Sequence, residues 1–113
     1  MLFRSCVRET FGALLATYQA KTAHDAAIAH SMAEIAGDET RHAELSWGIA
    51  RWASAQLSDE EQARVLEARR DAIATLRHEL SVEVDDELRR VAGVPSSRVA
   101  HALLDDLEAE LWN

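Results

Sequence analysis

The residues of this sequence whose types and spacing suggest chemistry are Glu39 and His42, at the centre of the stretch 28–53. Side chains at every third or fourth position of this stretch form one row: Ile28, Met32, Ile35, Glu39, His42, Ser46, Ile49 and Ala53. This period predicts a helix, and we expect the row to be its buried stripe. A buried carboxylate is costly unless something pairs with it. A Glu and a His three residues apart on one helical face therefore predict a bound metal ion.

Glu9 is the third candidate ligand and lies in a preceding helix that we predict over 2–21. It interrupts a row of small or apolar residues, although Glu9 taken alone is equally consistent with a solvated edge residue. The short break before Asp25, where Asp25 or His24 can cap the next helix, predicts an antiparallel hairpin with a second helix over 25–55. Glu9 and Glu39 then lie at the same level, roughly 22–23 Å from the turn. We therefore expect Glu9, Glu39 and His42 to converge in one layer.

Composition and capping signals predict an all-α fold for the whole chain. The 113 residues suit a single domain, with the hairpin over 2–55 and a helical extension over 58–113. One Pro and few β-branched runs argue against sheets. A capping box at Ser58 and Glu61 predicts a helix over 59–80, and Gly93 ends a short helix over 85–92 before a last helix over 96–112. In the third helix we expect Leu66, Ile73, Leu76 and Leu80 to point inward.

The charge and the apolar content indicate which partners to expect. A net charge of −8 argues against nucleic acid and against anionic membranes, and no apolar run approaches the length of a membrane span. The single Cys6 excludes an internal disulfide and fits a reducing, cytoplasmic compartment. Cys6 lies one turn from Glu9, so it is either a small buried hydrophobe, which packing favours, or a group beside the metal. Alanine accounts for 21 residues, and such a thin core favours a partner chain.

The segments 8–12 (RETFG) and 33–43 (AEIAGDETRHA) resemble the second helix pair of the ferritin-like di-iron superfamily, which includes ferritins, bacterioferritins and rubrerythrins. The resemblance extends over residues 6–52. It implies that Glu9 and Glu39 are carboxylate ligands, that Glu39 is the bridging one, and that His42 is the terminal imidazole ligand. These residues would also be the catalytic ones. The implied cofactor is a pair of iron ions, and manganese or zinc fits the same donors.

The first helix pair of that bundle, with its own ligands, is absent from this sequence. A complete site needs four carboxylates and two histidines, so one hairpin supplies half of it. Encapsulated ferritins are similar in having one such hairpin per chain and in building the site between two chains. We therefore expect a homodimer, or a multiple of dimers, that oxidises Fe(II) with O₂ and whose bundle is completed by dimerisation.

Two alternatives to this ferroxidase remain. Met1 to Arg4 run straight into a helical pattern without a capping residue, as in the surviving half of a longer gene whose metal site is a relic. The chain is otherwise a non-catalytic helical interaction module in which the Glu39–His42 pair binds zinc structurally or binds nothing. Redox turnover distinguishes the hypotheses, because zinc cannot cycle between oxidation states.

Overall fold

The computed structural model describes residues 2–111, with side chains from 6 to 110. It contains five helices: α1 (Leu2–Thr22), α2 (Ala26–Ser54), α3 (Asp59–Glu79), α4 (Asp86–Ala92) and α5 (Ser97–Leu111). Residues 2–111 include no β-strand, so the all-α prediction is confirmed and each described helix end lies within one residue of its predicted position. Trp112, where the last helix was predicted to end, lies outside the described residues.

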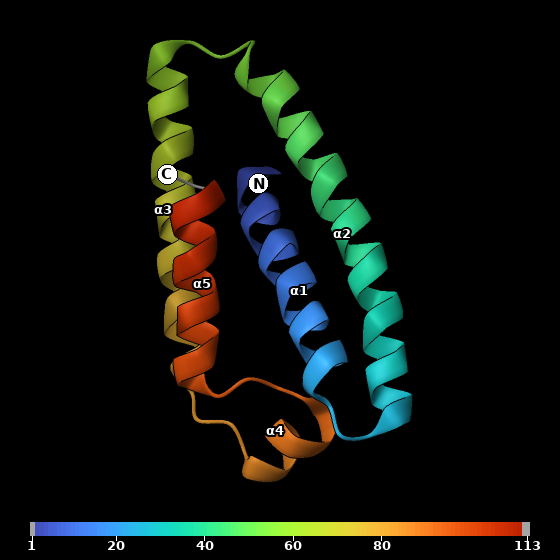
Figure 1. The fold of residues 1–113 in the computed structure, drawn as a ribbon. Coiled ribbons are helices and arrows are strands. Elements are labelled where there is room, and N and C mark those ends of the chain that lie inside the picture. Colours follow the sequence, from blue (N-terminus) through green and yellow to red (C-terminus); the bar gives the residue numbers. More distant parts are fainter. Residues whose placement is uncertain (1, 112–113) are drawn as a thin grey trace.

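Helix α1 lies in the middle of the fold. Figure 1 shows α2 on one side of α1 and the helices α3 and α5 on the other, while α4 crosses the end that holds the α1–α2 turn. Helices α1 and α2 form the expected antiparallel hairpin, and α2 and α3 extend past the other end of α1 (Figure 1). None of the helices within the described range is long and apolar enough to cross a membrane.

The helices begin and end where side chains satisfy their terminal backbone groups. Asp25 accepts a hydrogen bond from the Ile28 backbone N–H at 2.9 Å, and Ser58 and Glu61 form the predicted capping box. Gly93 ends α4 in the left-handed conformation, with φ of 70°. These short-range signals are why the sequence alone could place the helices.

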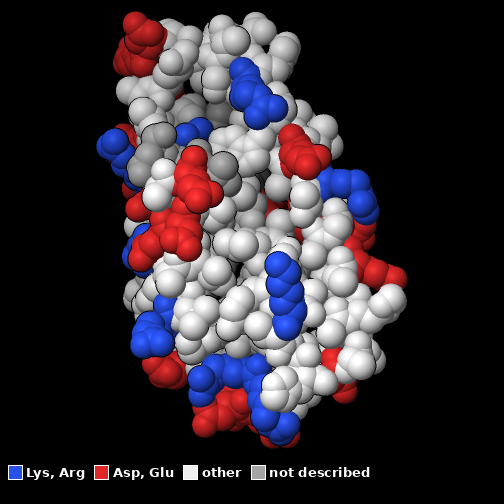
Figure 2. Space-filling view, in the orientation of Figure 1, with Lys and Arg blue, Asp and Glu red and all other residues white. Residues whose placement is uncertain are grey.

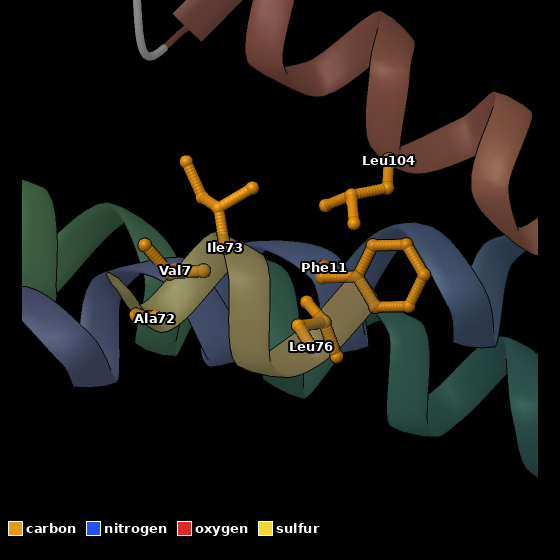
Figure 3. Packing of buried hydrophobic residues seen from close by; sticks show 6 residues of the cluster. All are labelled: Val7, Phe11, Ala72, Ile73, Leu76 and Leu104. Carbon is orange, nitrogen blue, oxygen red and sulfur yellow. The ribbon is translucent and has the colours of Figure 1, made fainter. Parts of the chain in front are cut away.

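The hydrophobic core lies between α1, α3 and α5. Figure 3 shows how it is built from Val7, Phe11, Ala72, Ile73, Leu76 and Leu104. Leu80 packs against this cluster, as the sequence predicted, but the prediction that Leu66 points inward is wrong, because its exposed fraction is 45%. Leu66 does not belong to the cluster between α1, α3 and α5; it lines an open cavity beside the C-terminal end of α2.

The contact between α1 and α2 is made by small residues. Ala13 and Ala16 of α1 and Ala43 and Ala50 of α2 are each no more than 9% exposed. Small side chains let two helices approach closely, so α1 covers only a narrow line along α2. This leaves both flanks of α2 uncovered within one chain.

The predicted buried stripe of α2 lies on one of those flanks. Ile35 and Ile49 are 43% and 44% exposed, and the His42 side chain is 62% exposed. The prediction that this row is buried is therefore wrong for the single chain. At about 100° per residue, the row is centred roughly 60° around the helix from the line through Ala43 and Ala50.

The last turn of α4 and the Gly93 that follows it hold the turn of the hairpin. The backbone N–H groups of His24 and Asp25 donate to the carbonyls of Arg90 and Val91, at 2.9 and 3.2 Å. The Thr22 hydroxyl donates to the carbonyl of Gly93 at 3.1 Å. These bonds satisfy backbone groups of the turn that connects the two helices of the candidate site.

Candidate metal centre

Glu9 extends from α1 toward α2. Its side chain is half-buried, and its carboxylate accepts a hydrogen bond from the Ser46 hydroxyl of α2. Side chains lean toward the N-terminus of their own helix, and in an antiparallel pair this direction leads toward the C-terminal half of α2. The lean explains why Glu9 reaches Ser46.

Glu39 leans the opposite way for the same reason. Its carboxylate lies over Gly12 of α1, where a side-chain Cβ would stand 3.9 Å from Glu39 Oε2. The Glu39 side chain is 35% exposed, and Nδ1 of His42 lies 3.9 Å from its Oε1 atom. The absence of a side chain at Gly12 therefore leaves open space beside the Glu39 carboxylate.

Glu9, Glu39 and His42 lie on the same flank of the hairpin, which we call the acidic flank. The two carboxylates diverge along the helix axes, one toward Ser46 and the other toward Gly12. Among the side chains that the structure describes, no group of three or more His, Cys, Asp or Glu residues is arranged to hold a metal ion. One chain thus gathers the three residues on one surface without assembling a complete ligand set.

Neither carboxylate of the acidic flank forms an ion pair with a Lys or an Arg among the described residues. Arg41 pairs with Asp38 instead, on the solvent-exposed side of α2. His42 is the one basic side chain within ion-pair distance of Glu39 in the described part of the chain. Two half-buried carboxylates and an imidazole are a donor set that iron, manganese and zinc accept, so the residues fit such an ion.

Ser46 is a participant that we did not assign from the sequence. It belongs to the same row as Glu39 and His42, one turn further along, and this position was the available signal. Its hydrogen bond fixes the orientation of the Glu9 carboxylate. Such a bond to a metal-ligating carboxylate is the kind of outer contact that orients ligands.

Cys6 is buried next to this flank. It is 1% exposed, as the packing interpretation predicted. Burial raises the pKa of its thiol, and the negative charge of Glu9 raises that pKa further. Cys6 is therefore a neutral, small apolar group in the free chain.

The tryptophans differ in environment. Trp47 packs against the core, and its indole N–H donates to the Thr10 hydroxyl at 2.8 Å. Trp52 is 68% exposed, so it does not pack within one chain. The ring of His101 has its Nε2 atom 2.9 Å from the Arg77 carbonyl oxygen.

Comparison of the chain with protein-family models, with curated proteins and with solved structures gives no match in any of the three. The resemblance to ferritin-like proteins therefore depends on the residues of the motif itself. Those residues are Glu9, Glu39 and His42, with the sequence that surrounds them.

Proposed function

We propose that the acidic flank is half of a di-iron carboxylate site, completed by a second copy of the chain, that oxidises Fe(II) with O₂. The observation that carries the proposal is the gathering of Glu9, Glu39 and His42 on one open flank. Both carboxylates there are half-buried, and neither forms an ion pair with a described Lys or Arg. Half-buried carboxylates in this condition favour a cation from solution.

Each residue has a role that follows from its position. Glu39, beside His42, is the candidate bridging ligand, and His42 is exposed enough to turn its ring toward an ion. Glu9 is the candidate terminal carboxylate, held by Ser46. When bound, two Fe(II) ions supply one electron each to O₂. The four carboxylates and two imidazoles of a dimer match the donor count of such sites.

The surface beside the acidic flank supports the dimer. Ile35 and Ile49 lie in the same row as Glu39 and His42 and are about half-exposed. Leu45 and Trp52 extend this apolar surface around α2, with exposed fractions of 64% and 68%. Packing α2 against its copy across a two-fold axis would bury these side chains and bring the second set of ligands to the first.

An anaerobic Fe(II) titration tests the proposal, with the mass determined in solution before air is admitted. We expect one iron per chain, in a dimer or larger assembly, followed by O₂ consumption. Glu39→Gln and His42→Gln should each weaken iron binding by at least about tenfold. Glu44→Gln, which removes an exposed acid from the same helix away from the flank, is the matched control and should leave binding unchanged. A strictly monomeric chain that carries two irons would contradict the shared site.

The metal-free protein provides a second test. Glu39→Ala should abolish iron binding and leave the unfolding free energy of the metal-free protein equal or higher, because it removes a partly buried charge without a cationic partner. Thermal unfolding in a chelator measures this. Unfolding of the metal-free variant would instead assign Glu39 a structural role.

The second candidate is a non-catalytic helical interaction module. Leu45 and Trp52 favour it, because an exposed apolar surface suits the association of chains whether or not a metal ion is bound. This alternative also covers a half-domain whose metal site is a relic. It predicts that the wild-type chain associates but consumes no O₂, and that Ile49→Glu abolishes the association. Zinc binding without O₂ consumption would support a structural site.

A further inference from the structure

A groove follows the other flank of α2, away from Glu39 and His42. It consists of two adjoining cavities of 450 and 420 Å³ that share Arg51. The first lies against α1 and has apolar walls that include Ala13, Ala43 and Trp47. The second lies between α2 and α3 and combines Arg51 and Arg69 with apolar side chains. We call the two cavities together the arginine groove.

The two arginines of the groove have no carboxylate partner among the described residues. The arginines that form ion pairs in the described part of the chain lie outside the groove and are Arg8, Arg41, Arg77 and Arg89. The Arg69 guanidinium instead lies over the Trp47 ring, 5.3 Å from its centre, and its buried Nε atom has no hydrogen-bond partner in the described part of the chain. In a chain with 20 acidic and 12 basic residues, two guanidinium groups that line one cavity without an acid are available to an anion from solution.

The apolar part of the groove specifies more than a bare anion. From Thr40 to Arg51, the α2 residues that line the apolar cavity extend over about 16 Å along the helix, longer than a ten-carbon chain. Trp47 and Ala43 offer apolar contact along this path. On the face of the molecule that Figure 2 shows, charged side chains lie mainly toward the edges, and a Lys or Arg side chain also lies near the middle.

We propose that the arginine groove binds a fatty-acid carboxylate, with the carboxylate between Arg51 and Arg69 and the alkyl chain along Trp47 and Ala43. Guanidinium groups bind carboxylates in a fork geometry, and the neighbouring apolar wall accepts the chain. Glu44 lines the apolar cavity about two turns from Arg51 and repels a negative head group there, which fixes the direction of binding. A second copy of the chain fits this charge pattern less well, since each copy carries a net charge of −8.

Titration of the full chain with decanoate, below its micelle concentration, tests the proposal by calorimetry and tryptophan fluorescence. We expect saturable binding of one decanoate per chain and a change in emission, because Arg69 lies over Trp47. Decanol lacks the carboxylate and acetate lacks the alkyl chain, so each should bind at least about tenfold more weakly. Binding of decanol as tight as that of decanoate, or no binding of decanoate, would overturn the proposal.

Matched arginine variants locate the carboxylate. Arg51→Gln should weaken decanoate binding by about tenfold or more without unfolding the chain, because Arg51 is exposed and forms no side-chain hydrogen bond or ion pair among the described residues. Arg64→Gln removes the same charge from an exposed position of α3 that does not line the groove, and should leave binding unchanged. Equal weakening by both variants would show a general charge effect and refute the assignment.

Two further outcomes distinguish fatty-acid binding in the arginine groove from chain association and from iron binding. If Arg51→Gln changes the mass in sedimentation while decanoate fails to bind, the groove holds a second copy and the proposal is wrong. Glu39→Gln, which tests the proposed iron site, should leave decanoate binding intact. The two proposals can therefore fail independently.

Discussion

Replacing Gly93 by alanine should destabilise the whole fold, because this glycine lies where the loop after α4 meets the turn of the metal-site hairpin. Its φ of 70° is a left-handed conformation, which costs a residue with a Cβ about 1–2 kcal/mol. The new Cβ would also stand 2.6 Å from the Ala23 backbone nitrogen and 2.7 Å from the Thr22 hydroxyl oxygen. Both contacts are too close for the loop to stay in place.

The magnitude follows from what the displaced loop loses. The Thr22 hydroxyl donates to the Gly93 carbonyl, and one such bond contributes about 0.5–1.5 kcal/mol. Together with the cost of the left-handed conformation, we expect a loss of about 1.5–3.5 kcal/mol. That is a large part of the roughly 5–15 kcal/mol by which ordinary domains are stable.

Urea unfolding followed by circular dichroism measures the effect. With a slope of about 2 kcal/mol per molar urea, the midpoint for Gly93→Ala should fall by about 1–2 M. Gly48→Ala is the matched control, since a Cβ there meets nothing within 4 Å inside α2, and it should raise stability by up to about 1 kcal/mol. A Gly93→Ala loss below about 1 kcal/mol would refute the reasoning.

Three further predictions concern the hydrophobic core, the Cys6 thiol and the dependence of stability on pH in the acid range. Phe11→Ala should cost about 3–5 kcal/mol in urea unfolding, because Phe11 lies within the α1–α3–α5 cluster, and a smaller loss would mean that the core closes around the cavity. Cys6 should react with a thiol reagent at pH 8 only as fast as the chain opens, since burial raises its pKa, and rapid reaction in the folded state would contradict its burial. The hydrogen bond from Arg8 lowers the pKa of Glu79 in the folded protein. The pair therefore stabilises the fold at pH values above about 4.3, the pKa of Glu in the unfolded chain. This stabilisation is lost as the pH falls through the lower pKa of the folded state. Glu79→Gln should flatten that part of the stability–pH curve, and an unchanged curve would show that the exposed pair contributes nothing.

The helices were predictable because their signals are local. Asp25 and Ser58 begin helices because their side chains accept hydrogen bonds from the first turn. Gly93 ends α4 because it has no Cβ and can adopt the left-handed conformation. The apolar period then identifies which stretches between them are helical. Neither inference requires knowledge of what packs against the helix.

Burial was less predictable because it depends on the neighbours. The row that contains Glu39 has a helical period, but the period does not say which side of α2 faces α1. In the structure Ala43 and Ala50 make the contact with α1, because small residues allow the closest approach. The row that contains Glu39 therefore lies on a flank of α2. Leu66 is exposed for a related reason, because it faces the open cavity between α2 and α3 and not the core cluster.

The candidate site shows the same division between local and tertiary information. Equal distances from the turn predicted that Glu9 and Glu39 lie at one level and converge, but their carboxylates point to Ser46 and to Gly12. Their divergence could not be read from residue counts, because it arises from the lean of side chains toward opposite ends in an antiparallel pair. Convergence on a metal ion then requires a change in side-chain orientation or donors from another chain.

The narrow contact between α1 and α2 makes both proposed sites available on one helix. Ala43 and Ala50 cover a thin line of α2, with Glu39 and His42 on one side of it and Trp47 and Arg51 on the other. At about 100° per residue the centres of these flanks are roughly 140° apart. A partner copy that packs on the acidic flank therefore leaves the arginine groove open. A cation site and an anion site can then be occupied at once, and single substitutions in α2 can remove one while sparing the other.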